Sequence, residues 1–109
     1  MKQKLSPSEM ELYQRTDEVL HYIWDPIKVS GVPEARDEYG PYLPYVYSLL
    51  RNTTDGKDIS TYLLSIECES MGFKVTDQSR EKVSEVVDIL INYREWIKEK
   101  SVQQLLHGS

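Results

Sequence analysis

Apolar residues recur at helical spacing in four stretches of the chain, separated by proline, glycine and polar residues. The stretches cover about 7–24, 41–52, 55–71 and 77–100. Residues three and four positions apart share one face of a helix, and no run alternates apolar and polar residues as a strand would. The inward positions are Leu12, Thr16, Val19, Leu20 and Ile23, then Leu43, Val46, Tyr47 and Leu50, then Ile59, Tyr62, Leu63 and Ile66, and finally Val83, Val86, Val87, Leu90, Ile91 and Ile97. The pattern predicts an all-α, single-domain bundle of about four helices.

Capping and breaking residues set the predicted helix boundaries. Ser6 can cap the first helix, with Pro7 at its first position. Pro26 disfavours helical geometry at the residue before it, so this helix should end near Trp24. Pro44 is tolerated only in the first turn of the second helix. Gly72 is suited to end the third helix, and Thr76 or Asp77 begins the fourth.

The connection between the first two helices, residues 25–40, is the most unusual part of the sequence. Two prolines and two glycines interrupt it, it is rich in charged residues, and aromatic residues border it on both sides. Connections of this length are uncommon in a small domain and are often functional. Its apolar content predicts that it packs on the bundle instead of extending into solvent.

Composition narrows the classes of function. The net charge of −5 and the pI of about 5.0 argue against binding to nucleic acid or an anionic membrane surface, which requires clustered Lys and Arg. The N-terminus has no apolar signal region, and Cys68, the single cysteine, cannot form an intramolecular disulfide. We expect Cys68 to pack as a small apolar side chain and the protein to be cytoplasmic.

The sequence predicts one helical domain over residues 1–109. Fraying is expected at residues 1–6 and 101–109, where the tail either continues the last helix or frays. Neither histidine is paired at metal-ligand spacing, and no phosphate loop or nucleophile motif occurs. We therefore predict no cofactor and no metal site. The oligomeric state stays open.

Five residues of the connection and its borders form a predicted structural motif: Trp24, Asp25, Pro26, Arg36 and Tyr39. Trp24 continues the apolar face of the first helix and should be core. Asp25 is predicted to accept hydrogen bonds from the amides of residues 27 and 28, with the alternative that it anchors a basic group of a partner. Arg36 is predicted to pair with Asp25 or another distant acid, with Asp25 and Glu38 as the preferred partners, since arginine favours two-pronged carboxylate contacts.

Asp37, Glu38, Tyr42 and Tyr45 are the candidate partner-binding residues. Tyr45 should point outward, while Tyr39 and Tyr42 can lie together. Exposed tyrosines are enriched at protein interfaces, and acids steer a basic partner. The alternative reading makes Asp37 and Glu38 a paired-carboxylate site for acid–base chemistry.

Three short sequence motifs resemble the pattern of a known family. They are Trp24-Asp25-Pro26-Ile27, Ala35-Arg36-Asp37-Glu38-Tyr39 and Tyr42-Leu43-Pro44. With this spacing the chain resembles the small bacterial all-helical proteins of the DUF1871 type, over roughly residues 15–98. It departs at Lys28, where the pattern often has Gly, and at Gly40, where it often has Asp, which argues against an acid-based metal site there.

Two hypotheses of function follow. The resemblance implies no enzymatic activity, but some similar small acidic proteins lie beside toxin genes as immunity proteins. The first hypothesis is accordingly a non-catalytic protein-binding module, in its most concrete form an immunity or antitoxin-like inhibitor that covers a basic toxin surface. The alternative is a small hydrolase or ligand-binding protein with a pocket formed by Asp25, Arg36, Asp37 and Glu38.

Overall fold

The protein is an all-α bundle, as the hydrophobic pattern predicts. The computed structural model describes residues 5–107, and no strand occurs among them. The helices are α1 (Pro7–Glu18), α2 (Leu43–Asn52), α3 (Lys57–Ser65) and α4 (Asp77–His107). π-helical turns extend two of them: η1 (Val19–Trp24) continues α1, and η4 (Ile66–Ser70) continues α3. Two 3₁₀ turns, η2 (Pro33–Ala35) and η3 (Gly40–Tyr42), lie between η1 and α2.

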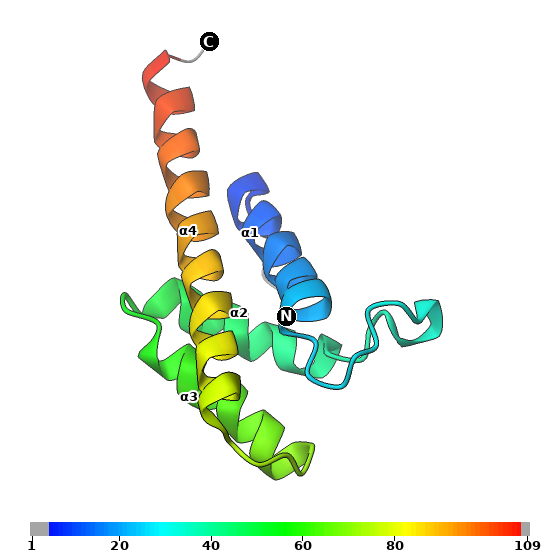
Figure 1. Cartoon of the computed structure of the whole chain (residues 1–109). Helices are drawn as coiled ribbons and strands as arrows, with labels where there is room; N and C mark the ends of the chain where they lie inside the picture. Colours follow the sequence, from blue (N-terminus) through cyan, green and yellow to red (C-terminus); the bar gives the residue numbers. More distant parts are fainter. Residues whose placement is uncertain (1–4, 108–109) are drawn as a thin grey trace.

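The long helix α4 is the element around which the others pack (Figure 1). Its C-terminal half lies beside α1, where the Lys100 ammonium is 3.0 Å from the Glu11 carboxylate. Its N-terminal half lies beside α3 (Figure 1). Because α4 has 31 residues at about 1.5 Å per residue, it sets the length of the molecule, which measures 51 × 30 × 29 Å.

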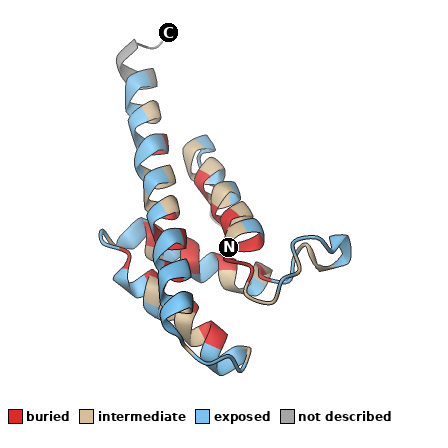
Figure 2. Ribbon diagram, viewed as in Figure 1, coloured by how far each residue is buried: buried red, intermediate tan, exposed pale blue. Residues whose placement is uncertain are grey.

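The buried residues follow the predicted inward faces. Figure 2 shows them on the sides of α1 and α4 that face the bundle. All the predicted inward positions are buried except Ile23, Tyr62 and Ile91, which are half-buried. Thr16 is also buried, and its hydroxyl donates to the carbonyl of Leu12 at 2.7 Å, so this polar group needs no further partner.

Residues at the helix ends confirm the predicted starts of α1 and α4 and the predicted end of the third helical stretch, whereas α3 begins at Lys57 after Gly56 and has no side-chain cap. The Ser6 hydroxyl accepts from the amide of Glu9, and the Glu9 carboxylate accepts from the amide of Ser6, a capping box. Thr76 caps α4 in a similar exchange with Ser79. Gly72, two residues after the last residue of η4, has a φ of 75°. The tail continues α4 to His107, whereas residues 1–4 and 108–109 lie outside the described residues.

Arg94 is a charged residue of α4 that does not extend freely into solvent. Its side chain is only 17% exposed, and it donates to the carbonyls of Leu50, Thr53 and Thr54 at 2.7, 2.7 and 3.2 Å. The last carbonyls of a helix have no intrahelical donors. Arg94 therefore caps the C-terminal end of α2 from another helix, a role that the pattern of its own helix does not reveal.

Two further observations concern expectations from composition. Cys68 is exposed, so the prediction that it packs inside is wrong; it follows the buried Glu67 and lies on a different face of η4. A search of the described helices finds none with a stretch both long enough and apolar enough to cross a membrane.

Candidate functional site

The connection leaves η1 through a sharp backbone turn at Asp25. This residue has φ 33° and ψ 60°, in the left-handed region that Asp and Asn tolerate better than most residues. Its carboxylate then accepts two amides of the following loop, Val29 to Oδ1 at 2.8 Å and Ser30 to Oδ2 at 3.1 Å. The Asp25 side chain thus holds the start of the loop in a closed turn.

The prediction that the Asp25 carboxylate accepts backbone amides is confirmed, but the predicted donors, residues 27 and 28, are wrong. The amide of Lys28 donates to the Asp25 carbonyl at 3.2 Å, and the amide of Ile27 donates to the Tyr39 hydroxyl at 3.2 Å. Both predicted donors are therefore already engaged. Lys28 has a φ of 59°, a conformation that glycine adopts without strain.

Tyr39 joins the far end of the connection to its beginning. Its hydroxyl donates to Asp25 Oδ1 at 2.6 Å, and its side chain is only 3% exposed. Burial, reinforced by the hydrogen bond to Asp25, raises the pKa of Tyr39 well above its usual value. Burial alone would raise the pKa of Asp25, but the hydrogen bonds from Tyr39, Val29 and Ser30 outweigh it, so the pKa of Asp25 is lowered.

Trp24 lies beneath this hydrogen-bonded pair. It is 2% exposed, as predicted for a core residue. The rings of Tyr39 and Tyr42 both pack against it, with centroid distances of 5.2 and 6.4 Å. Its indole Nε1 donates to Glu67 Oε2 at 2.8 Å, which links η1 to η4. The two tyrosines therefore lie together, as the sequence predicts, on a tryptophan that joins two helices.

Arg36 anchors the middle of the loop, but not to the predicted acid. Its Nη1 and Nη2 donate to Oδ1 and Oδ2 of Asp17 at 3.3 and 3.0 Å. The guanidinium also lies over the ring of Tyr22, 5.3 Å from the centroid. The prediction of a carboxylate pair with a distant acid is confirmed, but the preferred partners, Asp25 and Glu38, are wrong. The carboxylate of Asp25 is already occupied, and the turn η2 brings Arg36 back to α1.

The four predicted partner-binding residues fall into two places. Asp37 and Glu38 are both exposed on the loop that projects from one side of the bundle (Figure 1). The prediction that the connection packs on the bundle therefore holds for its buried ends, Asp25 and Tyr39, but not for residues 30–34, which are exposed. Tyr45 is 53% exposed on α2, where it packs edge-to-face against Tyr62 of α3 at 4.6 Å. Tyr42 is half-buried against Trp24. Within residues 5–103, no hydrogen bond or ion pair joins the two acids to these tyrosines.

The pocket of the alternative hypothesis is not assembled from its four residues. Arg36 lines an open hollow of about 440 Å³ together with His21, Ser30 and the backbone of Gly31, but Asp25, Asp37 and Glu38 do not line it. His21 is 2% exposed, and its Nδ1 has no hydrogen-bond partner among the described residues. Among the residues that the structure describes, no three His, Cys, Asp or Glu side chains are grouped so that they could hold a metal ion.

Three residues that hold the connection or line its hollow were not predicted from the sequence. Glu67 lies four positions after Leu63, on the apolar face of its helix, so its place in the stripe indicates a buried carboxylate that needs a donor. Asp17 carries no such signal, because its pairing depends on the path of the loop. His21 lies off the α-helical stripe and is buried in a π-helical turn, which a 3.6-residue period does not indicate.

Comparison of the chain with models of protein families, with curated proteins and with solved structures finds no match. The likeness to proteins of the DUF1871 type therefore stays a prediction. What can be said of function rests on the geometry of the anchored connection.

Proposed function

We propose that the protein is a non-catalytic protein-binding module whose anchored loop presents acidic side chains to a basic partner. The observation that carries this proposal is the order of four consecutive residues. Arg36 is tied to Asp17 and Tyr39 is tied to Asp25, while Asp37 and Glu38 between them are exposed. Two acids are thus held between two fixed points.

Such an arrangement favours binding because it reduces the ordering that association requires. Immobilising a free side chain or loop on binding costs about 0.5–1.5 kcal/mol for each flexible side chain. A loop fixed in advance by two buried or paired anchors avoids much of that loss. Since the charge of Arg36 is neutralised by Asp17, the field of the loop tip is dominated by its exposed acids, Glu34, Asp37 and Glu38.

The exposed tyrosine on α2 supplies apolar area. Tyr45 offers a large, rigid ring, and tyrosine is among the residues that most often carry binding energy at protein interfaces. Tyr42 contributes only the part of its ring that Trp24 leaves accessible. In its most concrete form, the proposal is a bacterial cytoplasmic immunity or antitoxin-like inhibitor that covers a basic surface of a toxin domain.

The test begins with capture of a partner from the native host. The bait is the wild-type chain, and the matched bait carries Asp37→Asn and Glu38→Gln. A control bait carries Glu85→Gln and Asp88→Asn, which remove two exposed acids from α4 instead. The proposal requires a basic partner that the wild-type and control baits retain and that the loop variant loses.

Binding kinetics at two ionic strengths then separate the roles of the side chains. Asp37→Asn should slow association and weaken its dependence on salt, because a rim charge acts mainly on the encounter. Tyr45→Ala should raise the dissociation rate while the circular dichroism spectrum is unchanged. If both variants bind the captured partner with wild-type rates, the interface lies elsewhere and the proposal fails.

A further inference from the structure

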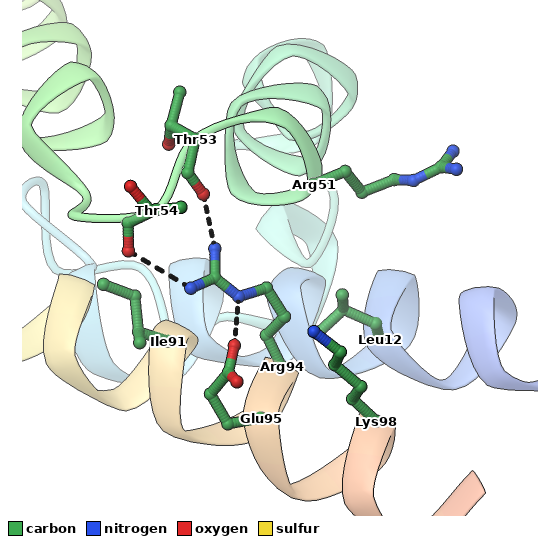
Figure 3. A pocket seen from close by; sticks show the side chains of 8 residues that line it. All are labelled: Leu12, Arg51, Thr53, Thr54, Ile91, Arg94, Glu95 and Lys98. Atoms are coloured by element: carbon green, nitrogen blue, oxygen red, sulfur yellow. Dashed lines mark hydrogen bonds and ion pairs between the residues drawn. The ribbon is translucent and has the colours of Figure 1, made fainter. Parts of the chain in front are cut away.

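A second feature of the molecule lies on a different face, in the groove between α1, α2 and α4. It is a hollow of about 660 Å³ whose wall contains three cationic residues, Arg51, Arg94 and Lys98, and one acid, Glu95 (Figure 3). In a chain with a net charge of −5, this is a local excess of positive charge. Such a concentration favours an anion at this place.

The three cationic side chains differ in how many of their hydrogen-bond donors are already engaged within the protein. Arg94 is largely committed, since it donates to the carbonyls of Leu50, Thr53 and Thr54 and to Glu95. Its fixed charge nevertheless lies in the wall of the hollow. Lys98 is exposed, and Figure 3 shows its ammonium directed from α4 toward the open space. It makes no hydrogen bond or ion pair to another described residue, so its donors are available.

Arg51 lies on the other side of the hollow. Its stem extends from α2, and its Nη2 contacts Glu9 Oε2 at 2.8 Å. One exposed ion pair of this kind contributes about 0–1 kcal/mol, so an anion can compete for the guanidinium. Lys98 and Arg51 thus lie on two edges of the hollow, with the fixed charge of Arg94 in its wall.

The hollow continues into an apolar extension. A second hollow of about 270 Å³ shares Leu12, Arg51, Arg94 and Lys98 with the first. Its further lining is mostly apolar, with Tyr47, Ile97 and the 48% exposed Val102. Ser8, Ser101 and Glu9, the acid paired with Arg51, complete it. A ligand that filled both hollows would place an anionic group among the cations and an apolar body along Leu12 and Ile97.

From this arrangement we infer that the groove between α1, α2 and α4 binds an organic anion with an apolar body, such as an aryl-alkyl carboxylate. The cations recognise the carboxylate by charge-assisted hydrogen bonds, which are stronger than neutral ones. The apolar extension removes the body of the ligand from water. The site is separate from the loop proposed to bind a protein, so each can fail without the other.

The test uses 4-phenylbutyrate as the probe, with three comparison molecules. 4-Phenylbutanol keeps the apolar body without the charge, while acetate and inorganic phosphate provide an anion without the body. Titration into the full-length, isotope-labelled protein is followed by amide chemical shifts. The expected result is saturable binding of 4-phenylbutyrate, with shifts at Thr53, Thr54 and Glu95 and none at Asp37 or Glu38.

Variants of the cationic residues test which side chains bind the carboxylate of the ligand. Lys98→Met should weaken 4-phenylbutyrate binding by about tenfold, the equivalent of one charge-assisted contact. Arg51→Met provides a second variant on the other edge, and Arg80→Met, an exposed change at the start of α4, is the matched control that should bind as the wild type does. Each variant is checked for wild-type stability by its thermal melt.

Three results would overturn the inference. The first is the absence of saturable shifts with 4-phenylbutyrate at the walls of the hollow. The second is equal affinity for 4-phenylbutanol, acetate or phosphate, which would remove either the charge or the apolar body from the recognition. The third is unchanged affinity in both Lys98→Met and Arg51→Met.

Discussion

Replacing Tyr39 by Phe tests how the connection is held. Tyr39→Phe keeps the ring against Trp24 but removes the hydroxyl that donates to Asp25 Oδ1 at 2.6 Å and accepts from the amide of Ile27 at 3.2 Å. A hydrogen bond to a charged group contributes about 1.5–3 kcal/mol, and a neutral one about 0.5–1.5 kcal/mol. We expect the free energy of unfolding to fall by about 2–3 kcal/mol, which lowers the Tm by roughly 10–20 °C in a domain of this size.

The same substitution has a defined dependence on pH. The folded pKa of Asp25 lies below its usual value of 3.8, so its contribution to stability is present above that value and is lost as the pH falls through the folded pKa. Without the Tyr39 hydroxyl, burial still acts on Asp25 and its pKa rises. The difference in stability between wild type and Tyr39→Phe should therefore be full at neutral pH and should shrink well below pH 3.8.

Urea unfolding at neutral and acidic pH measures both effects. Tyr45→Phe is the matched control, because this tyrosine is exposed and its hydroxyl has no hydrogen bond to another described residue. It should change the free energy of unfolding by less than about 0.5 kcal/mol. The reasoning is refuted if Tyr39→Phe is no more destabilising than Tyr45→Phe, or if its effect is the same at both pH values.

Three further substitutions test the packing that supports the site, each read from the free energy of unfolding. Gly56→Ala should lower the free energy of unfolding by about 2–4 kcal/mol, because Gly56 has a φ of 77° and an added Cβ would overlap Val87 Cγ1. Gly31→Ala is the control and should be nearly neutral, because the space around Gly31 is open; equal effects of the two substitutions would contradict this. Trp24→Ala should cost about 3–5 kcal/mol, and a thermal melt that barely moves would show that the ring is not buried. Arg94→Met should cost about 2 kcal/mol by leaving the end of α2 without its cap, so an effect below about 0.5 kcal/mol would remove that role.

The fold could be predicted because the helices have apolar faces and most of their ends have local boundary residues. Ser6, Pro7, Pro44 and Gly72 act within one turn of their own positions, where the chemistry of a single residue decides the backbone. The burial of Leu50 and Leu90 follows from spacing alone. These are local rules, and they do not depend on the path of the chain between helices.

The site could be predicted only in part, because its contacts depend on that path. The bond from Trp24 to Glu67 spans 43 positions and the pair of Arg36 with Asp17 spans 19. The sequence shows that Arg36 needs a carboxylate, but 18 acids are present, and proximity along the chain favours the wrong ones. The role of Arg94 is hidden in the sequence for a similar reason, since the carbonyls that it caps lie at the end of another helix.

Amide hydrogen exchange at Val29 and Ser30 tests the central claim most directly, namely that the connection is held in one conformation before any partner binds. Both amides donate to the Asp25 carboxylate in a loop that would otherwise be open to solvent. If local opening requires about 2 kcal/mol, both should exchange at least about thirtyfold more slowly than in an unstructured chain, and this protection should fall in Tyr39→Phe. Exchange of both amides in the wild type at the rate of an unstructured chain would contradict the account.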